Sequence, residues 1–241
     1  LQLSMKRRSH RLLLFCLAAI LLAMAVAPLR AQRFAVESEI RPNPLSAGES
    51  LRRIRVEEGL RVELVASEPL VADPVDLAFD ESGRMFVVEI TGFNQTDKTR
   101  THSRVRVLED TNGDGRMDRG TTLAEDLDYA QGLLPMKGGV LVTTNSAILF
   151  LRDSDGDGKA DLKEVLFECT KSINIDRQMG SPRRGIDNAI YINLGLGKKD
   201  ITPPGAPGRK LELANNNLRY DPATGEISAS SGAGQFGNTF D

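Results

Sequence analysis

A repeat with a spacing of 43 residues constrains the fold of this chain more than any other feature of its sequence. The strand-like residues 105–109 lead into an acidic turn at 110–115, and a further strand-like run follows the turn. Residues 148–152 lead into a second acidic turn, at 153–158, which begins 43 residues after the first (153 minus 110). Hairpins of one kind therefore recur at a fixed spacing, which predicts a repeated all-β structure.

Each repeat has room for four short strands. In the first unit, alternating or apolar runs cover residues 75–79, 85–89, 105–109 and about 121–123. The second unit uses residues 132–136, 140–144, 148–152 and 165–167, and a third follows at 186–192 and 218–227, with a long loop expected over 193–217. Four strands in about 43 residues are typical of a β-propeller blade, whereas a β-sandwich would not repeat its hairpins at a fixed offset.

The fold class that we expect is all-β, a partial β-propeller with about three four-stranded blades of a larger ring over residues 59–241. Three blades do not close a ring, and an open set leaves unpaired strand edges. A strand expected at residues 61–66 precedes the first full blade, in the place of a strand that completes the last blade of many propellers. We therefore expect this chain to be the N-terminal part of a longer protein.

The first residues predict export from the cytoplasm. A basic segment at 6–8 precedes an apolar run of 16 residues, 12–27, as in a secretory signal peptide. We expect a signal peptide at 1–31, a linker and a short helix at 32–58, and a protein of the periplasm or cell envelope. The alternative is an uncleaved anchor at 12–29, which would make the protein membrane-associated. Ser46 and Glu49 have the spacing of a capping box that begins the short helix.

Composition excludes several classes of function. Lys and Arg number 31 against 33 Asp and Glu, so a basic surface for nucleic acid is not expected. With two His, two Cys and no C-x-x-C-H motif, the chain has no haem attachment site and no Cys/His zinc cluster. Removal of residues 1–31 would leave Cys169 as the single thiol. A small buried apolar residue is the main interpretation of Cys169, and a reactive thiol is the alternative.

The second acidic loop matches the twelve-residue calcium-binding pattern. Its candidate ligands, at positions 1, 3, 5, 7, 9 and 12, are Asp153, Asp155, Asp157, the Lys159 carbonyl, Asp161 and Glu164. The first loop supplies Asp110, Asn112, Asp114, the Arg116 carbonyl and Asp118, with Thr121 in place of the final Glu. We expect calcium to bind the first loop more weakly and to act structurally. The alternative is that both are tight turns, in which Asp and Gly are favoured anyway.

His102 is the weak catalytic candidate of the sequence. It is the one imidazole outside the predicted signal peptide, and we expect it to lie in the loop between the second and third strands of the first unit. Loops of that kind gather at one mouth of a propeller channel, and imidazole suits general-base chemistry. The competing interpretation is an exposed His in a polar loop.

Four stretches together resemble the propeller of the bacterial membrane-bound dehydrogenase family, whose relatives include PVC-type haem-binding CxxCH proteins. The stretches are residues 59–71, 79–89, 107–115 and 234–241. That family is similar in fold to soluble quinoprotein sugar dehydrogenases, and its members commonly add a cytochrome c domain. The resemblance implies an exported oxidoreductase that uses pyrroloquinoline quinone and passes electrons to a c-type cytochrome. Residues 179–188 depart from it, because they lack the His and Trp that we expect there in relatives.

Two classes of function therefore stay open. The first is a sugar or alcohol dehydrogenase propeller linked to a quinone or a haem domain outside this chain. The second is a non-catalytic periplasmic propeller with calcium-stabilised hairpins, whose partners are glycans, other small molecules or proteins.

Overall fold

The computed structural model describes residues 44–91, 102–172, 178–195, 197–206, 208–232 and 234–239. The chain divides into two compact units, residues 1–53 and 54–241. The described part of the first unit contains helix α2 (Ala47–Arg53). Its capping box is confirmed, because the Glu49 amide donates to Ser46 Oγ at 3.3 Å and the Ser46 amide donates to Glu49 Oε2 at 3.0 Å. The Ser46 hydroxyl, which donates to Glu49 Oε2 at 2.7 Å, and the Ser46 amide hold the pKa of Glu49 below its usual value. The predicted signal peptide at 1–31 lies outside the described residues.

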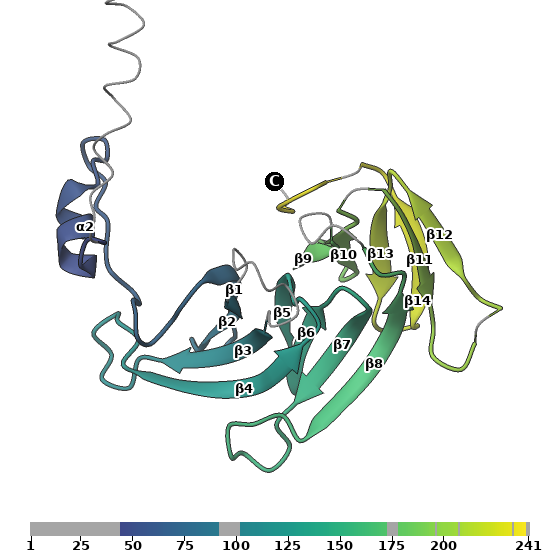
Figure 1. Ribbon diagram of the computed structural model, residues 1–241, viewed down its shortest axis with the longest axis horizontal. Coiled ribbons are helices and arrows are strands. Elements are labelled where there is room, and N and C mark those ends of the chain that lie inside the picture. The colour runs from purple at the N-terminus through teal and green to yellow at the C-terminus, as the bar shows by residue number, and fades with distance from the viewer. Residues whose placement is uncertain are drawn as a thin grey trace, which may run out of the picture. The chain divides into compact units, whose positions relative to one another are not determined.

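The second unit is all-β and consists of three antiparallel sheets, none of them closed into a barrel. Sheet 1 has the order β1 (Pro74–Phe79), β2 (Met85–Thr91), β3 (His102–Glu109), β4 (Arg119–Leu127). Sheet 2 has the order β5 (Gly132–Met136), β6 (Gly139–Thr143), β7 (Ala147–Arg152), β8 (Leu162–Cys169), β11 (Lys198–Thr202), β12 (Leu211–Ala214). Sheet 3 has the order β9 (Gly180–Arg184), β10 (Ile190–Asn193), β13 (Asn217–Asp221), β14 (Glu226–Ser230). Figure 1 shows the sheets following one another, from blue at β1 to yellow at β14.

The sheets pack face to face in chain order. The first core joins one face of sheet 1 to sheet 2 through the buried side chains Phe86, Val88, Val105, Val107, Leu123, Leu133, Val140, Val142, Leu149 and Leu151. The second core joins the other face of sheet 2 to sheet 3 through a set that includes Leu141, Ile148, Phe167, Ile190, Ile192, Leu218 and Tyr220. Successive side chains of a strand point to opposite faces of its sheet. Sheet 2 is apolar on both faces because sheets 1 and 3 cover one face each.

The loop predicted over residues 193–217 is wrong in part. It contains the hairpin β11–β12, and β11 pairs with β8 through Ile201 opposite Cys169. Ile201 and Leu213 are fully buried in the second core. The prolines of this stretch favoured a loop, but Pro203 and Pro204 follow the end of β11 rather than lying within a strand.

The strand predicted at residues 61–66 is not formed in the structure. The apolar alternation is real, but the segment lacks a neighbouring strand with which to form a ladder among the described residues. Among the described residues, its backbone contacts the repeat through a hydrogen bond that the Met117 amide donates to the Val65 carbonyl at 2.8 Å. A strand needs a paired edge, so the residues stay extended but unpaired.

The first strands of the three sheets, β1, β5 and β9, lie next to one another. Their sheets fan out from this line of first strands, and the acidic loops lie at the ends of β3 and β7. This arrangement separates two regions in which polar side chains gather, the acidic loops and the line of first strands. Over the residues that the structure describes, no helix is long and apolar enough to cross a membrane.

Candidate functional site

The two acidic loops have the same hydrogen bonds at positions 43 residues apart. Asp110 and Asp153 each accept from two glycine amides, at 2.7 and 2.8 Å in the first loop and at 2.7 and 2.9 Å in the second. Asn112 and Asp155 each accept from the amide two residues later, at 2.9 and 3.2 Å. The glycines of both loops have positive φ, between 77° and 87°, which explains why the turns need them. The spacing seen in the sequence is therefore a spacing of identical turns.

The second loop brings three of its candidate ligands together. One carboxylate oxygen from each of Asp153, Asp155 and Asp157 lies within 4.8 Å of the others, a separation that suits a shared cation. The other two carboxylates are not in this group. Asp161 accepts from the amide of Ser154 at 3.0 Å and from its hydroxyl, which together lower the pKa of Asp161. Glu164 lies on β8 opposite Phe150. The pKa of the Tyr220 phenol is raised mainly by burial and to a smaller extent by the nearby charge of Glu164.

The first loop holds fewer charges in the same geometry. Arg116 and Lys159 occupy equivalent positions, and their amides donate to Asp114 and Asp157 at 2.8 and 2.7 Å. The hydrogen bond from the Gly115 amide is the main cause that lowers the pKa of Asp110. Asp118 accepts from the amide and hydroxyl of Thr111, as Asp161 does from Ser154. Asn112 is neutral where Asp155 is charged, so the first loop attracts a cation less.

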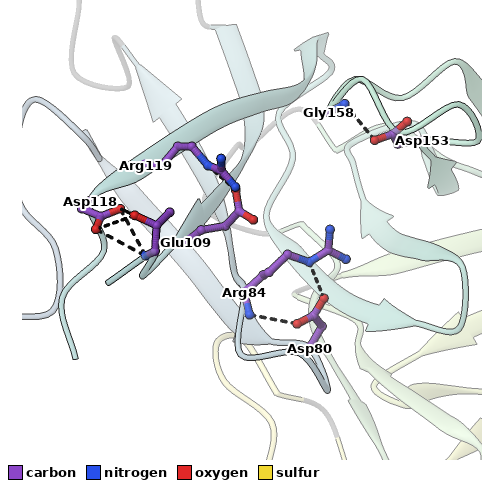
Figure 2. A network of polar contacts seen from close by, with 8 residues as sticks. Asp80, Arg84, Glu109, Asp118, Arg119, Asp153 and Gly158 are labelled. Carbon is purple, nitrogen blue, oxygen red and sulfur yellow. Dashed lines mark hydrogen bonds and ion pairs between the residues drawn. The ribbon is translucent and has the colours of Figure 1, made fainter. Parts of the chain in front are cut away.

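The second loop and the strand ends at Glu109 and Arg119, which flank the first loop, line a cavity of about 500 Å³ between sheets 1 and 2. Figure 2 shows its charged lining, with Arg84 beside Asp80 and Arg119 beside Glu109, each pair at 2.8 Å, and with the Asp153–Gly158 bond close by. In each ion pair the carboxylate balances the charge of the arginine. The second loop touches sheet 1 directly, because a Cβ on Gly158 would lie 2.8 Å from Thr121 Cγ2. This cavity therefore belongs to the support of the loops.

A second polar region lies along the first strands, and the sequence did not predict it. A pocket of about 600 Å³ is lined from sheets 1 and 3 and from connecting segments, by residues that include Asp76, Ile90, Gln178, Arg183, Asn193 and Phe236. Asp76 on β1 reaches both other sheets: it accepts from the Leu133 amide at 3.1 Å and pairs with Arg183 Nη2 at 3.1 Å. The one available signal was an acidic residue inside the apolar run 75–79.

The most unusual side chain of this pocket is Gln178. It is 2% exposed, and neither its amide nitrogen nor its amide oxygen has a hydrogen-bond partner among the residues that the structure describes. Asn193, also buried, shows the contrast: its Oδ1 accepts from the Gly180 amide at 2.6 Å and its Nδ2 donates to the Gln235 carbonyl at 3.4 Å. An unpaired buried amide costs about 1–3 kcal/mol for each group. Gln178 therefore has the property expected of a residue whose partner is a ligand.

The structure places the two remaining candidates as follows. His102 is the first residue of β3, opposite Thr91, and its side chain lies outside the described residues. Cys169 is the last residue of β8 and packs beside the second core. Burial raises the pKa of its thiol to about 12, so it is protonated near neutral pH and behaves as a small apolar residue.

The chain is thus an all-β protein. Its stacked antiparallel sheets carry two similar acidic hairpin loops and a polar pocket at their first strands. Residues 46–241 match a protein family described as a domain of unknown function, DUF7133, and the chain belongs to that family. Its description names no activity, so the resemblance to membrane-bound dehydrogenases stays a prediction. No curated protein matches the chain.

Proposed function

We propose that the three sheets are consecutive blades of a β-propeller and that the pocket at their first strands binds a neutral, polyhydroxylated ligand such as a sugar. The blade arrangement is supported by the twin loops, by the face-to-face packing in chain order and by the adjacent first strands. The observation that carries the ligand proposal is the unpaired, buried amide of Gln178.

The lining selects the chemistry of the ligand. Asp76 and Arg183 compensate one another, so the pocket favours no net charge. The Gln178 amide needs a donor and an acceptor side by side, and a hydroxyl group can act as either. Exposed Phe236 adds an apolar surface against which the C–H face of a sugar ring can pack.

The quinone implied by the family resemblance does not fit this lining. Pyrroloquinoline quinone is a tricarboxylate, so a site for it needs several cations. Arg183 is the single cationic side chain among the described residues that line the pocket, and Asp76 neutralises it. We therefore do not propose the quinone as the ligand of this pocket. Electron transfer to a c-type cytochrome remains a prediction from the resemblance alone.

Calcium is the second ligand that we propose, at the second acidic loop. Three carboxylates within 4.8 Å repel one another, and a bound Ca²⁺ would replace that repulsion with attraction. Its role would be to hold the β7–β8 hairpin, because the loop is distant in the fold from the polar pocket. We also propose that the protein acts outside the cytoplasm, on the basis of the basic and apolar segments at its N-terminus.

The test of the ligand proposal replaces Gln178 with a residue of similar shape that forms no such hydrogen bonds. In Gln178→Met, two unpaired polar atoms disappear, so we expect the melting temperature of the ligand-free protein to rise by a few degrees. Binding to a panel of mono- and oligosaccharides, measured by calorimetry or on a glycan array, should fall tenfold or more. A structural role alone would not produce a more stable protein with weaker binding.

A matched control is available in Lys199→Met, which also converts a buried polar side chain to methionine, but on β11. We expect it to leave sugar binding unchanged. If no sugar binds the wild-type protein, or if Gln178→Met binds sugars as well as the wild type does, the ligand proposal is wrong.

A further inference from the structure

The first acidic loop contacts residues 61–66 in the way that the second loop contacts sheet 1. In the second loop, the Ala160 amide donates to the carbonyl of Leu123 at 2.7 Å, and Leu123 belongs to β4, the outermost strand of sheet 1. In the first loop, the equivalent residue, Met117, donates to the carbonyl of Val65 at 2.8 Å. Val65 therefore has, relative to the first loop, the place that the outermost strand of sheet 1 has relative to the second loop.

The face of sheet 1 that points toward this position is partly uncovered. Leu77 and Phe79 share a face with Val87 and Met85, to which they are paired across β1 and β2. Leu77 is 47% exposed and Phe79 is 52% exposed. In the strand pairing of sheet 2, Leu133 occupies the position that Leu77 occupies in sheet 1. Leu133 is fully buried because sheet 1 covers it. The same position is thus covered in one sheet and open in the next.

A polar atom on the open face also lacks a partner. Arg106 lies opposite Val87 on β3, and its Nε is buried without a hydrogen bond. It lines a cavity of about 500 Å³ together with Leu64, Ala66 and Met117. Leu149, which occupies the equivalent position of sheet 2, is buried in the first core. A structure that covers the open face must therefore be apolar near β1 and must bring a hydrogen-bond acceptor to Arg106.

We propose that this face packs against an additional three-stranded antiparallel sheet of the same polypeptide, which takes residues 61–66 as its fourth and outermost strand. The inference rests on the proposed blade arrangement but not on the proposed sugar ligand. Sheet 3 of a second copy is a poor occupant, because one of its faces is already in the second core and the other carries the Asp187–Arg219 ion pair at 2.8 Å and Tyr191. Pairing with an edge strand would order residues 61–66 by backbone hydrogen bonds.

The test is amide hydrogen exchange, measured by mass spectrometry on the protein as its own cells produce it. If the sheet is present, the amides of residues 61–66 should exchange at least a hundredfold more slowly than an unpaired chain, as those of β4 should. Exchange of 61–66 at the rate of an unpaired chain, with β4 protected, would overturn the proposal.

Two further measurements sharpen this result. Leu77→Asp should place a charge in the contact and abolish the protection of 61–66, whereas Ile186→Asp, at a side chain that is 99% exposed, should not change it. Native mass spectrometry decides the source of the sheet. Protection in a species with the mass of one polypeptide agrees with the proposal, and protection only in a heavier complex would overturn its assignment to the same polypeptide. Failure of sugar binding would leave both readouts unaffected.

Discussion

Calcium should stabilise this protein through the second acidic loop, and a matched pair of alanine variants can show it. Asp155→Ala and Asn112→Ala each remove one side-chain acceptor, from the Asp157 amide at 3.2 Å and from the Asp114 amide at 2.9 Å. Each substitution therefore removes one hydrogen bond to a backbone amide, about 1 kcal/mol, and in the first loop the Asp114 amide keeps Asp110 Oδ1 at 3.2 Å as a second acceptor. They differ in charge, because only Asp155 belongs to the group of three carboxylates.

The expected magnitude follows from ligand binding to the folded state. At a free calcium concentration of one hundred times the dissociation constant, the free energy of unfolding rises by about 2.7 kcal/mol. For a domain of this size that corresponds to a rise in melting temperature of about 5–11 °C. Asp155→Ala should lose most of this rise, and Asn112→Ala should keep most of it.

The assay is thermal unfolding followed by circular dichroism, with calcium or with chelator at matched ionic strength. In chelator, both variants should melt slightly below the wild type and close to each other. A wild type that calcium does not shift would mean that the loops are only acidic turns. A larger loss of the calcium effect in Asn112→Ala than in Asp155→Ala would refute the ranking of the two loops.

Three further predictions concern packing, burial and export. Leu133→Ala should lower the free energy of unfolding by about 2–5 kcal/mol in denaturant titrations, because its side chain is fully buried in the first core; a loss under about 1 kcal/mol would contradict the packing. Burial lowers the pKa of Lys199, so Lys199→Met should be more stable than wild type near pH 7, although it loses the hydrogen bond that Lys199 Nζ donates to the Thr170 carbonyl at 3.2 Å. The unfolded chain binds this proton more tightly, so the advantage should shrink as pH rises toward the ordinary lysine pKa; an advantage that grows with pH would be inconsistent with this cause. N-terminal sequencing of the protein from a periplasmic fraction should find a chain that begins after Ala31, and a product that begins at Met5 would contradict export.

The sequence predicted the local hairpins well because their signals are local. Positive-φ glycines, Asx turns and alternating apolar residues act within a few residues of one another, so the turn at Asp153 could be recognised from its own neighbours. Pairing between distant segments has no such signal. The sequence of the hairpin β11–β12 does not show that it joins β8, and residues 61–66 have a strand pattern without a strand to pair with.

The candidate ligands of the second loop illustrate the same limit. Asp153, Asp155 and Asp157 converge because they share one turn. Glu164 lies further along, and its side-chain direction is set by the pairing of β8 with β7, opposite Phe150. Spacing alone therefore identified the turn, but the strand register decided which carboxylates lie together.

Asp76 and Arg106 lie where the repeat is broken, and this gives them a common physical cause. By strand register, Asp76 of sheet 1 corresponds to Gly132 of sheet 2, where a Cβ would lie 2.5 Å from the Ser181 amide nitrogen. Sheet 3 thus leaves no room for a side chain at Gly132, while Asp76 has room to reach Arg183 across the first strands. Arg106 likewise replaces a leucine of the repeat. Apolar repeat positions are constrained by packing between sheets, so a polar residue persists there only where a partner compensates its burial. For Asp76 that partner is Arg183 within the chain, and for Arg106 it is the acceptor that we propose on the additional sheet.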